Sequence, residues 1–310
     1  MSDQPTTAPP PGIYHDVPFS EYRTWPYMNN SLLKRAVVRD RKVSMAHLKA
    51  AIDEHAGIST PPTKAMQFGS FLHTASLETL QIAARYVVMP AFEGDADNVT
   101  QAGKPTNSKN TTYYRARANE FATVNGDREV VSQADFDRMQ AMLRSLRDNS
   151  IAVQYLRSGG HPETCLVWDD AASGVRMKAR VDLVRNSTCR LIDVKTDADP
   201  LAFSHSIHKY CYDMQGAIYT DGMAANTGGL QWEWIMVVLG STSPYITLAA
   251  PLHERALQAG RELYRKVLAQ YVVARDTDKW PGPANPTAFT MPDCVYDDES
   301  ITMGGKPVSF

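Results

Sequence analysis

The sequence contains few cysteines, and their spacing excludes the usual cysteine-based sites. Cys165, Cys189, Cys211 and Cys294 are the only four in 310 residues, and none of them belongs to a C-x-x-C pair. A structural zinc site usually needs such closely spaced ligands. We therefore expect four reduced thiols that serve mainly as packing residues.

The sequence also lacks a long apolar run, a signal-peptide core and a strong net charge. No stretch reaches the roughly 20 apolar residues that a membrane-spanning helix needs, and the first residues are polar and rich in proline. We therefore expect a cytoplasmic protein with no membrane partner. The formal net charge is −2, so binding to nucleic acid would require a local basic surface. A G-x-x-x-x-G-K-[ST] phosphate loop is absent too, and ATP is not expected as a cofactor.

What is present indicates a globular α/β protein with a sizeable core, because 43% of the residues are hydrophobic and 21% are charged. The pattern divides the chain into a disordered tail (1–11), a helical N-terminal part (12–150) with a mobile polar loop (91–111), a sheet core (151–282) and a C-terminal tail (283–310). In the sheet core we predict strands over 164–168, 175–184, 190–195, 230–239 and 245–249, and helices over 210–226 and 251–275.

Two predicted strands, joined by a short polar turn, carry the most informative residues. Side chains in a strand alternate between faces. In the first strand one face therefore holds Val175, Met177, Ala179, Val181 and Leu183, and the other holds Arg176, Lys178, Arg180 and Asp182. In the second strand Asp193 and Lys195 share a face. If the register permits, both carboxylates and the ammonium meet beside a basic row, which suits a divalent metal and an attacking water.

A simpler interpretation is that Asp193 and Lys195 form an exposed ion pair of little energetic value. The neighbours of Asp193 count against this, because Leu191-Ile192 precede it and Val194 follows it. Such a strand lies inside a sheet, where a carboxylate is costly unless it is paired or binds a metal.

The chain resembles PD-(D/E)XK nucleases, and within them the RecB-like branch and the RecE-type (exonuclease VIII) nuclease domains of phages and prophages. The likeness covers residues 12–282 as one nuclease domain. It rests on an ordered series: Gly12-Ile13-Tyr14, Phe68 to His73, His161-Pro162-Glu163, Arg180-Val181-Asp182, Ile192 to Thr196, and Met214 to Gly222 with its Q-x-x-x-Y spacing. Val181 departs from the pattern, since many relatives have proline there. The resemblance implies a central mixed β-sheet flanked by helices, with residues 151–282 as the catalytic sheet core.

The resemblance also implies roles for individual residues. Asp182 and Asp193 would bind Mg²⁺ together with the backbone carbonyl of Val194, and Mn²⁺ could substitute. His73 would complete the metal shell, with Glu163 as an additional candidate ligand. Catalysis would further involve Lys195, which orients or deprotonates the water or neutralises phosphate charge, and the positioning pair Gln215 and Tyr219. DNA would be held by Arg176, Lys178 and Arg180. An iron–sulfur cluster is not expected, because the early cysteine and the late cysteine trio of clustered relatives are missing.

The function that the resemblance implies is digestion of linear double-stranded DNA from its 5′ ends, which leaves 3′ single strands for recombination by strand annealing. Its expected partners are duplex DNA ends, a single-strand annealing protein and further copies of the chain in a homo-oligomeric ring. Two alternatives remain open. One is a PD-(D/E)XK endonuclease of the restriction-like or structure-specific type, and the other is a non-catalytic DNA-binding recombination scaffold.

Overall fold

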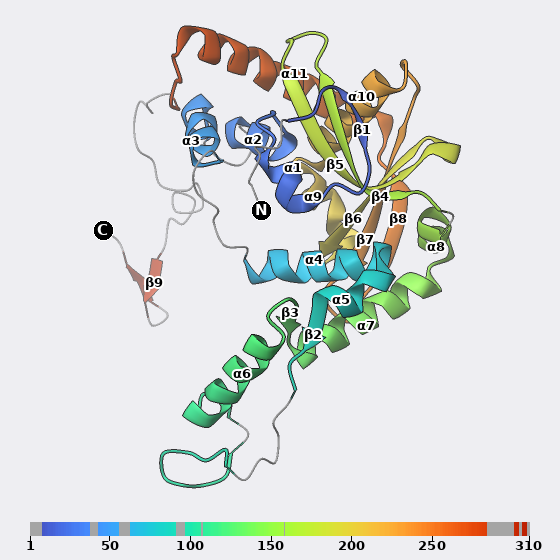
Figure 1. The fold of residues 1–310 in the computed structure, drawn as a ribbon. Coiled ribbons are helices and arrows are strands. Elements are labelled where there is room, and N and C mark those ends of the chain that lie inside the picture. Colours follow the sequence, from blue (N-terminus) through green and yellow to red (C-terminus); the bar gives the residue numbers. More distant parts are fainter. Residues whose placement is uncertain are drawn as a thin grey trace, which may run out of the picture.

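The computed structural model describes residues 8–37, 43–55, 63–90, 97–106, 108–157, 159–283, 301–303 and 306–308. A six-stranded sheet lies at the centre, and helices cover both of its faces (Figure 1). The chain therefore has the predicted α/β architecture, including a largely helical N-terminal part.

The central sheet has the strand order β1-β4-β5-β6-β7-β8. Neighbouring strands are antiparallel except β6 and β7, which are parallel along their whole length. Parallel neighbours need a crossover connection, and two helices between β6 and β7 provide it. The strands are β1 (Gly12–Tyr14), β4 (His161–Asp169), β5 (Arg176–Arg185), β6 (Arg190–Asp197), β7 (Glu233–Gly240) and β8 (Thr247–Pro251).

The larger core lies between one face of the sheet and five helices. Trp168, Met177 and Trp234 of the strands pack there against Met214 and Leu257 of the helices. The helices are α2 (Asn30–Leu33), α3 (Met45–His55), α9 (Phe203–Tyr210), α10 (Tyr212–Asn226) and α11 (Glu254–Thr277); the 3₁₀ turns η1 (Lys34–Ala36) and η4 (Pro200–Ala202) adjoin them.

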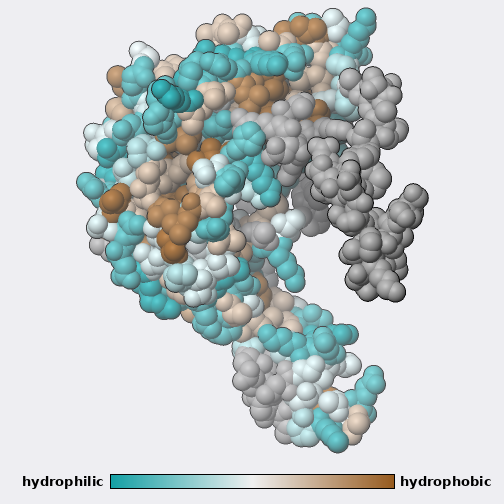
Figure 2. Space-filling view, turned by 180° about the vertical axis from the view of Figure 1, so that it is seen from behind, coloured by the Kyte–Doolittle hydropathy of each residue, from teal (hydrophilic) through white to brown (hydrophobic). Residues whose placement is uncertain are grey.

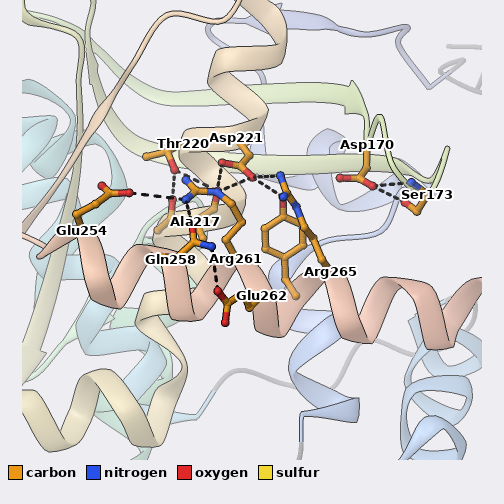
Figure 3. Close-up of polar contacts among 12 residues, drawn as sticks. Asp170, Ser173, Ala217, Thr220, Asp221, Glu254, Gln258, Arg261, Glu262 and Arg265 are labelled. Carbon is orange, nitrogen blue, oxygen red and sulfur yellow. Dashed lines mark hydrogen bonds and ion pairs between the residues drawn. The ribbon is translucent and has the colours of Figure 1, made fainter.

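Polar contacts also join α10 to α11 around one carboxylate (Figure 3). Arg261 Nε donates to the two oxygens of Asp221 at 2.9 and 3.1 Å, and Arg265 Nη2 donates to Oδ2 at 3.3 Å. The hydroxyl of the buried Tyr264 donates to the same oxygen. These bonds hold α10 in a fixed position between α11 and the sheet.

The opposite face of the sheet has two separate covers. Over β6 and β7, Phe71 and Met142 pack on Ile192, Val194 and Val237 in a second core. The helices there are α4 (Lys64–Leu77), α5 (Ile82–Arg85), α7 (Gln133–Asp148) and α8 (Ser150–Arg157), with η2 (Thr79–Gln81) between α4 and α5.

Over β4 and β5 the cover is the N-terminal segment. Helix α1 (Phe19–Thr24) and the buried Trp25 lie on Cys165 and Val167. The sheet surface between the two covers is therefore left open, and Asp182 lies there.

An arm projects from the helical part below α4 and α7 in Figure 1. It begins at β2 (Tyr86–Val88), contains α6 (Thr112–Val124), and returns through β3 (Glu129–Val131), which pairs with β2 in parallel. Seen from behind, the surface of the arm is mainly hydrophilic (Figure 2). The arm contains the predicted mobile loop, of which residues 91–96 and 107 lie outside the described part of the chain.

The predictions for the two ends of the chain fall partly outside the described residues, since 1–7 and 284–300 are not among them. Within the predicted N-terminal tail, the carbonyls of Pro9 and Pro10 accept hydrogen bonds from the hydroxyls of Tyr27 and Tyr14. Within the predicted C-terminal tail, β9 (Ile301–Met303) and β10 (Lys306–Val308) pair with each other. None of the helices in the described residues combines the length and the apolar composition that crossing a lipid bilayer requires.

The structure corrects two details of the predicted sheet core. The helix predicted over 210–226 is the second of two, because the chain turns at Cys211, whose φ is +55°, between α9 and α10. Leu183 does not share a face with Met177 and Val181: it belongs to the second core, whereas they belong to the larger one. The side chains of β5 therefore stop alternating regularly between the two faces of the sheet at Asp182.

Candidate metal centre at diverging strands

Strands β5 and β6 separate just before the two aspartates that the sequence singled out. Their pairing joins Leu183 to Ile192 and continues through the short turn η3 (Asn186–Thr188), but it does not extend to Asp182 and Asp193. The backbone N–H of Val194 donates instead to Asp182 Oδ2 at 2.8 Å. A side-chain carboxylate thus replaces a backbone acceptor where the ladder ends.

The pairing between β4 and β5 is also irregular at this level. Pro162 pairs with Leu183 and Thr164 with Val181, but Glu163, opposite Asp182, has a φ of +50°. A left-handed conformation is unfavourable for a residue other than glycine, and such strain concentrates at functional sites. In this left-handed conformation the side chain of Glu163 lies beside Asp182.

His73, Glu163 and Asp182 form a cluster in which one ligand atom from each lies within 4.8 Å of the others. His73 comes from α4, and its Nε2 lies 2.9 Å from the carbonyl oxygen of Val194. Its Nδ1 lies 3.6 Å from Asp182 Oδ2, which is too far for a hydrogen bond. The structure therefore brings together four of the five predicted metal-binding groups, namely His73, Glu163, Asp182 and the Val194 carbonyl; Asp193 is not part of this cluster.

Asp193 is the most deeply buried carboxylate of the site, with 1% of its side chain exposed. Gln215 of α10 donates from Nε2 to Asp193 Oδ1 at 3.0 Å. Lys195 Nζ lies 2.6 Å from Oδ2. That contact is a close ion pair without hydrogen-bond alignment, so Oδ2 has no hydrogen-bond donor. Asp193 therefore has Gln215 on one oxygen and the Lys195 ammonium on the other.

Burial and mutual charge shift the pKa values of these groups. Burial raises the pKa of Asp182 to about 6; His73 opposes this rise and the charge of Asp193 adds to it. Burial alone would lower the pKa of Lys195, but the carboxylates of Asp193 and Asp182 outweigh it and raise the pKa. Lys195 therefore carries a positive charge beside two carboxylates.

The donor set fits a divalent cation. Carboxylate oxygens, a backbone carbonyl and an imidazole are ligands for Mg²⁺, Mn²⁺ and similar ions. The independent sign is Asp182: its side chain is only 15% exposed and accepts the Val194 N–H, but no ammonium or guanidinium among the described residues pairs with it, and a buried charged oxygen is costly unless a cation compensates it.

A cleft of about 570 Å³ leads to the cluster. Phe19 and Tyr22 of α1 line one side, and Met66 and His73 of α4 line another. Tyr219 of α10 also lines this cleft, and its ring meets Trp234 edge-on with centroids 5.2 Å apart. A larger cavity of about 970 Å³ lies between α3 and α11 and is not lined by these carboxylates.

The predicted basic row does not form one DNA-facing surface. Lys178 is 1% exposed, and its ammonium donates to the carbonyls of Tyr22 and Trp25 at 2.9 and 2.6 Å. It holds the N-terminal segment on the sheet and is inaccessible to DNA. Arg176 forms an exposed ion pair with Asp169.

Only Arg180 of the row lies in the cleft. Its Nε donates to Glu163 Oε2 at 2.6 Å, and its Nη1 donates to the Val17 carbonyl at 2.8 Å. The alternation in the sequence correctly put the three basic residues on the face of Asp182, but it could not reveal that the N-terminal segment covers part of that face.

Two neighbours of the site were not singled out as site residues from the sequence. The ammonium of Lys195 lies 4.9 Å from the ring centroid of Tyr212, at the start of α10, and that of Lys34 lies 5.4 Å from the same centroid. Lys34 follows the cap residue Asn29 by one and a half turns, and no motif marks it. Only the packing of α2 on α10 brings it to the site.

A family model and one solved structure agree with this fold. Residues 31–290 match the family described as PDDEXK-like domain of unknown function (DUF3799). The crystal structure of a Eubacterium rectale protein named "Putative exonuclease" has a similar fold: it covers 94% of each chain with a TM-score of 0.55 and 13% identity. The structure of SSO0001 covers 56% of this chain and 81% of its own, with a TM-score of 0.27 and 14% identity. No curated protein matches the sequence.

Proposed function

The chain belongs to the DUF3799 family of PDDEXK-like domains, and we propose that it is a metal-dependent nuclease that digests linear duplex DNA from its ends. The observation that carries this proposal is the cluster of His73, Glu163 and Asp182 beside the Asp193–Lys195 pair, where β5 and β6 diverge. Two carboxylates and an ammonium beside an open cleft suit metal-assisted hydrolysis of a phosphodiester.

The residues of the site divide into ligands, charge carriers and supports. Asp182, Asp193, Glu163, His73 and the Val194 carbonyl hold the cation. Mg²⁺ held there, or Mn²⁺ in its place, would supply Lewis-acid chemistry to the scissile phosphate and to the attacking water.

The remaining groups act on the substrate or on the ligands. Lys195 faces the phosphate and stabilises the negative charge that grows on it during attack. Gln215 keeps the Asp193 carboxylate in place through its hydrogen bond, and Tyr219 lines the cleft beside it. Arg180 orients Glu163. The site needs neither ATP nor an iron–sulfur cluster for this chemistry.

Attack from a DNA end, rather than at an internal position, is supported by the name of the similar Eubacterium rectale protein and by the likeness to RecE-type domains. By the same likeness the digestion starts at 5′ ends and leaves 3′ single strands for recombination. A ring of identical chains around the product strand and a single-strand annealing protein as partner complete the proposal. Light scattering in solution measures the oligomeric state and so tests the ring. A monomer would exclude the ring but would leave the proposed chemistry of the site in place.

The decisive experiment uses linear duplexes that carry a label on one strand at a single end, beside a closed circle of the same sequence. With Mg²⁺ we expect mononucleotides from 5′ termini, an intact circle, and no product in EDTA. Cutting of the circle would favour a restriction-like or structure-specific endonuclease. Binding without any cleavage in Mg²⁺ or Mn²⁺ would favour a recombination scaffold.

A further inference from the structure

Lys34 is held rigidly at the edge of the metal centre. Asn29 caps α2 by accepting the Leu32 N–H at 2.9 Å, and the turn η1 continues directly from that helix. Leu33 and Ala36, on either side of Lys34, are 0% and 5% exposed in the larger core. The backbone of Lys34 is therefore fixed, and its partly buried side chain reaches the ring of Tyr212 at the start of α10.

The ammonium of Lys34 lies close to a second ammonium. Its Nζ is 5.4 Å from the ring centroid of Tyr212, and Nζ of Lys195 is 4.9 Å from the same centroid. The electron-rich ring stabilises both cations. It does not remove their mutual repulsion, which an anion bound beside both ammonium groups would relieve.

Lys34 has no anionic partner of its own in the part of the chain that the structure describes. No hydrogen bond or ion pair holds its Nζ there, and Asp193, a site carboxylate whose charge acts on Lys34, already contacts Lys195 and Gln215. Burial and the charge of Lys195 lower the pKa of Lys34 to about 8, although Cys211, Asp193 and Asp213 act in the opposite direction. A partly buried charge without a partner is unfavourable until a ligand supplies one.

We propose that Lys34 binds a backbone phosphate of the substrate strand, next to the phosphate that Lys195 faces at the metal centre. This rests on the proposed function, because it assumes that a nucleic acid occupies the cleft. Ser31, one turn before Lys34, lines that cleft, so a strand lying in it passes within reach of α2. Lys34 is thus a binding residue contributed by the N-terminal helices to a site whose ligands come mainly from the sheet.

The competing explanation is that Lys34 only balances the negative charge of Asp193 and Asp213 inside the folded protein. The two explanations differ in what the removal of the charge does. If Lys34 is a structural counter-ion, removing its charge should destabilise the free protein. If its ammonium binds DNA, removing the charge should weaken DNA binding, and the stability of the free protein should stay the same or rise slightly.

The test compares Lys34→Met with Arg35→Met, an exposed neighbour in the same turn with the same charge. Binding of a fluorescent end-containing duplex is measured with Ca²⁺ in place of Mg²⁺, at several salt concentrations, and the melting temperature is measured without DNA. For Lys34→Met we expect affinity about five- to tenfold weaker at 0.1 M salt, and a salt slope lower by about one phosphate contact. Arg35→Met should match the parent, and neither variant should melt earlier.

If the parent binds and cuts DNA, equal affinities and salt slopes for Lys34→Met and Arg35→Met would overturn the role of Lys34 but leave the proposed nuclease function standing. A melting temperature that falls for Lys34→Met, with an unchanged salt slope, would establish the counter-ion role instead. If the parent itself neither binds nor cuts DNA, the proposed function and the inference fail together. Recovery of the salt slope in Lys34→Arg would support a direct phosphate contact.

Discussion

At the residue scale, Asp193 and Asp182 differ in what holds them. Asp193 lies between an ammonium and an amide, whereas Asp182 accepts a backbone N–H. An asparagine at either position keeps nearly the same shape and one acceptor oxygen but loses the charge that a cation needs. For Asp193→Asn and Asp182→Asn we expect cleavage to fall at least a hundredfold, since even residues that only support a metal ligand cost about ten- to a hundredfold.

The measurement pairs cleavage rates with calorimetric titration of Mg²⁺ or Mn²⁺, which should show weaker binding in both variants. Circular dichroism controls for folding. A variant that binds the metal as tightly as the parent would remove that aspartate from the metal shell.

The same metal titration should distinguish Lys195 from the two aspartates. An ammonium cannot bind a cation, and its loss removes positive charge beside the metal site. Lys195→Ala should therefore lose cleavage while its affinity for Mg²⁺ stays equal or rises. A loss of metal affinity as large as that of Asp193→Asn would mean that the lysine acts by holding Asp193 in place.

Lys178 is the residue for which the structure reverses the expectation from the sequence. Its ammonium satisfies the carbonyls of Tyr22 and Trp25 inside the protein. In Lys178→Met the side chain keeps its bulk but these acceptors lose a charged donor. We expect unfolding in urea to become easier by about 1–3 kcal/mol, with an unchanged salt dependence of DNA binding. The matched control is Arg176→Met, whose exposed ion pair should contribute nothing measurable to stability. Weaker DNA binding in a fully stable Lys178→Met would restore the original interpretation.

At the element scale, the site depends on how closely α10 approaches helix α11 on one side and the sheet on the other. A Cβ at Gly260 would lie 2.2 Å from the carbonyl oxygen of Asp213, and one at Gly222 would lie 2.8 Å from the ring of Trp168. The backbone of α10 cannot move away, because the sheet lies behind it. Only glycine fits at these two contacts. The contacts fix the position of α10, and this position lets Gln215 reach Asp193.

Gly260→Ala tests this contact. The methyl group forces the two helices apart, for which we expect a loss of about 1–3 kcal/mol in the free energy of unfolding and a lower cleavage rate from the displaced Gln215. Gly69→Ala on α4 is the control, since no atom lies within 4 Å of its Cβ position. It should be neutral or stabilising by up to about 1 kcal/mol. Equal stabilities for the two variants would mean that α11 adjusts without cost.

The elements also show how far a sequence can be interpreted. Alternation and amphipathic spacing predicted the strands β4 to β8 and the helix α11 nearly to their ends, because each buries one regular face. They failed at Leu183, where β5 changes its facing, since such an irregularity depends on the strand divergence and on α4 packing nearby. The same limit applies to Lys34: its importance arises from the contact between α2 and α10, which no local pattern encodes.

At the scale of the whole molecule, the proposed metal ligands come from separate parts of the chain, so a bound cation should stabilise the fold itself. His73 belongs to α4, Glu163 to β4 and Asp182 to β5. At tenfold its dissociation constant, Mg²⁺ should add about 1.4 kcal/mol to the free energy of unfolding. Thermal melting should show a shift for the parent that EDTA reverses and that Asp182→Asn lacks. An equal shift in Asp182→Asn would locate the stabilising ion elsewhere.

The parallel pairing of β2 with β3 has a consequence for the covalent continuity of the chain. Because β2 and β3 are hydrogen-bonded neighbours, the two ends of the arm lie side by side, and the arm is a loop with a narrow base. His73 precedes this loop, and Glu163, Asp182 and Asp193 follow it. A chain cut within the arm would thus yield two fragments, neither of which holds the whole site. Under the proposed function we expect the two fragments, co-expressed as separate polypeptides, to cleave DNA only when they reassemble.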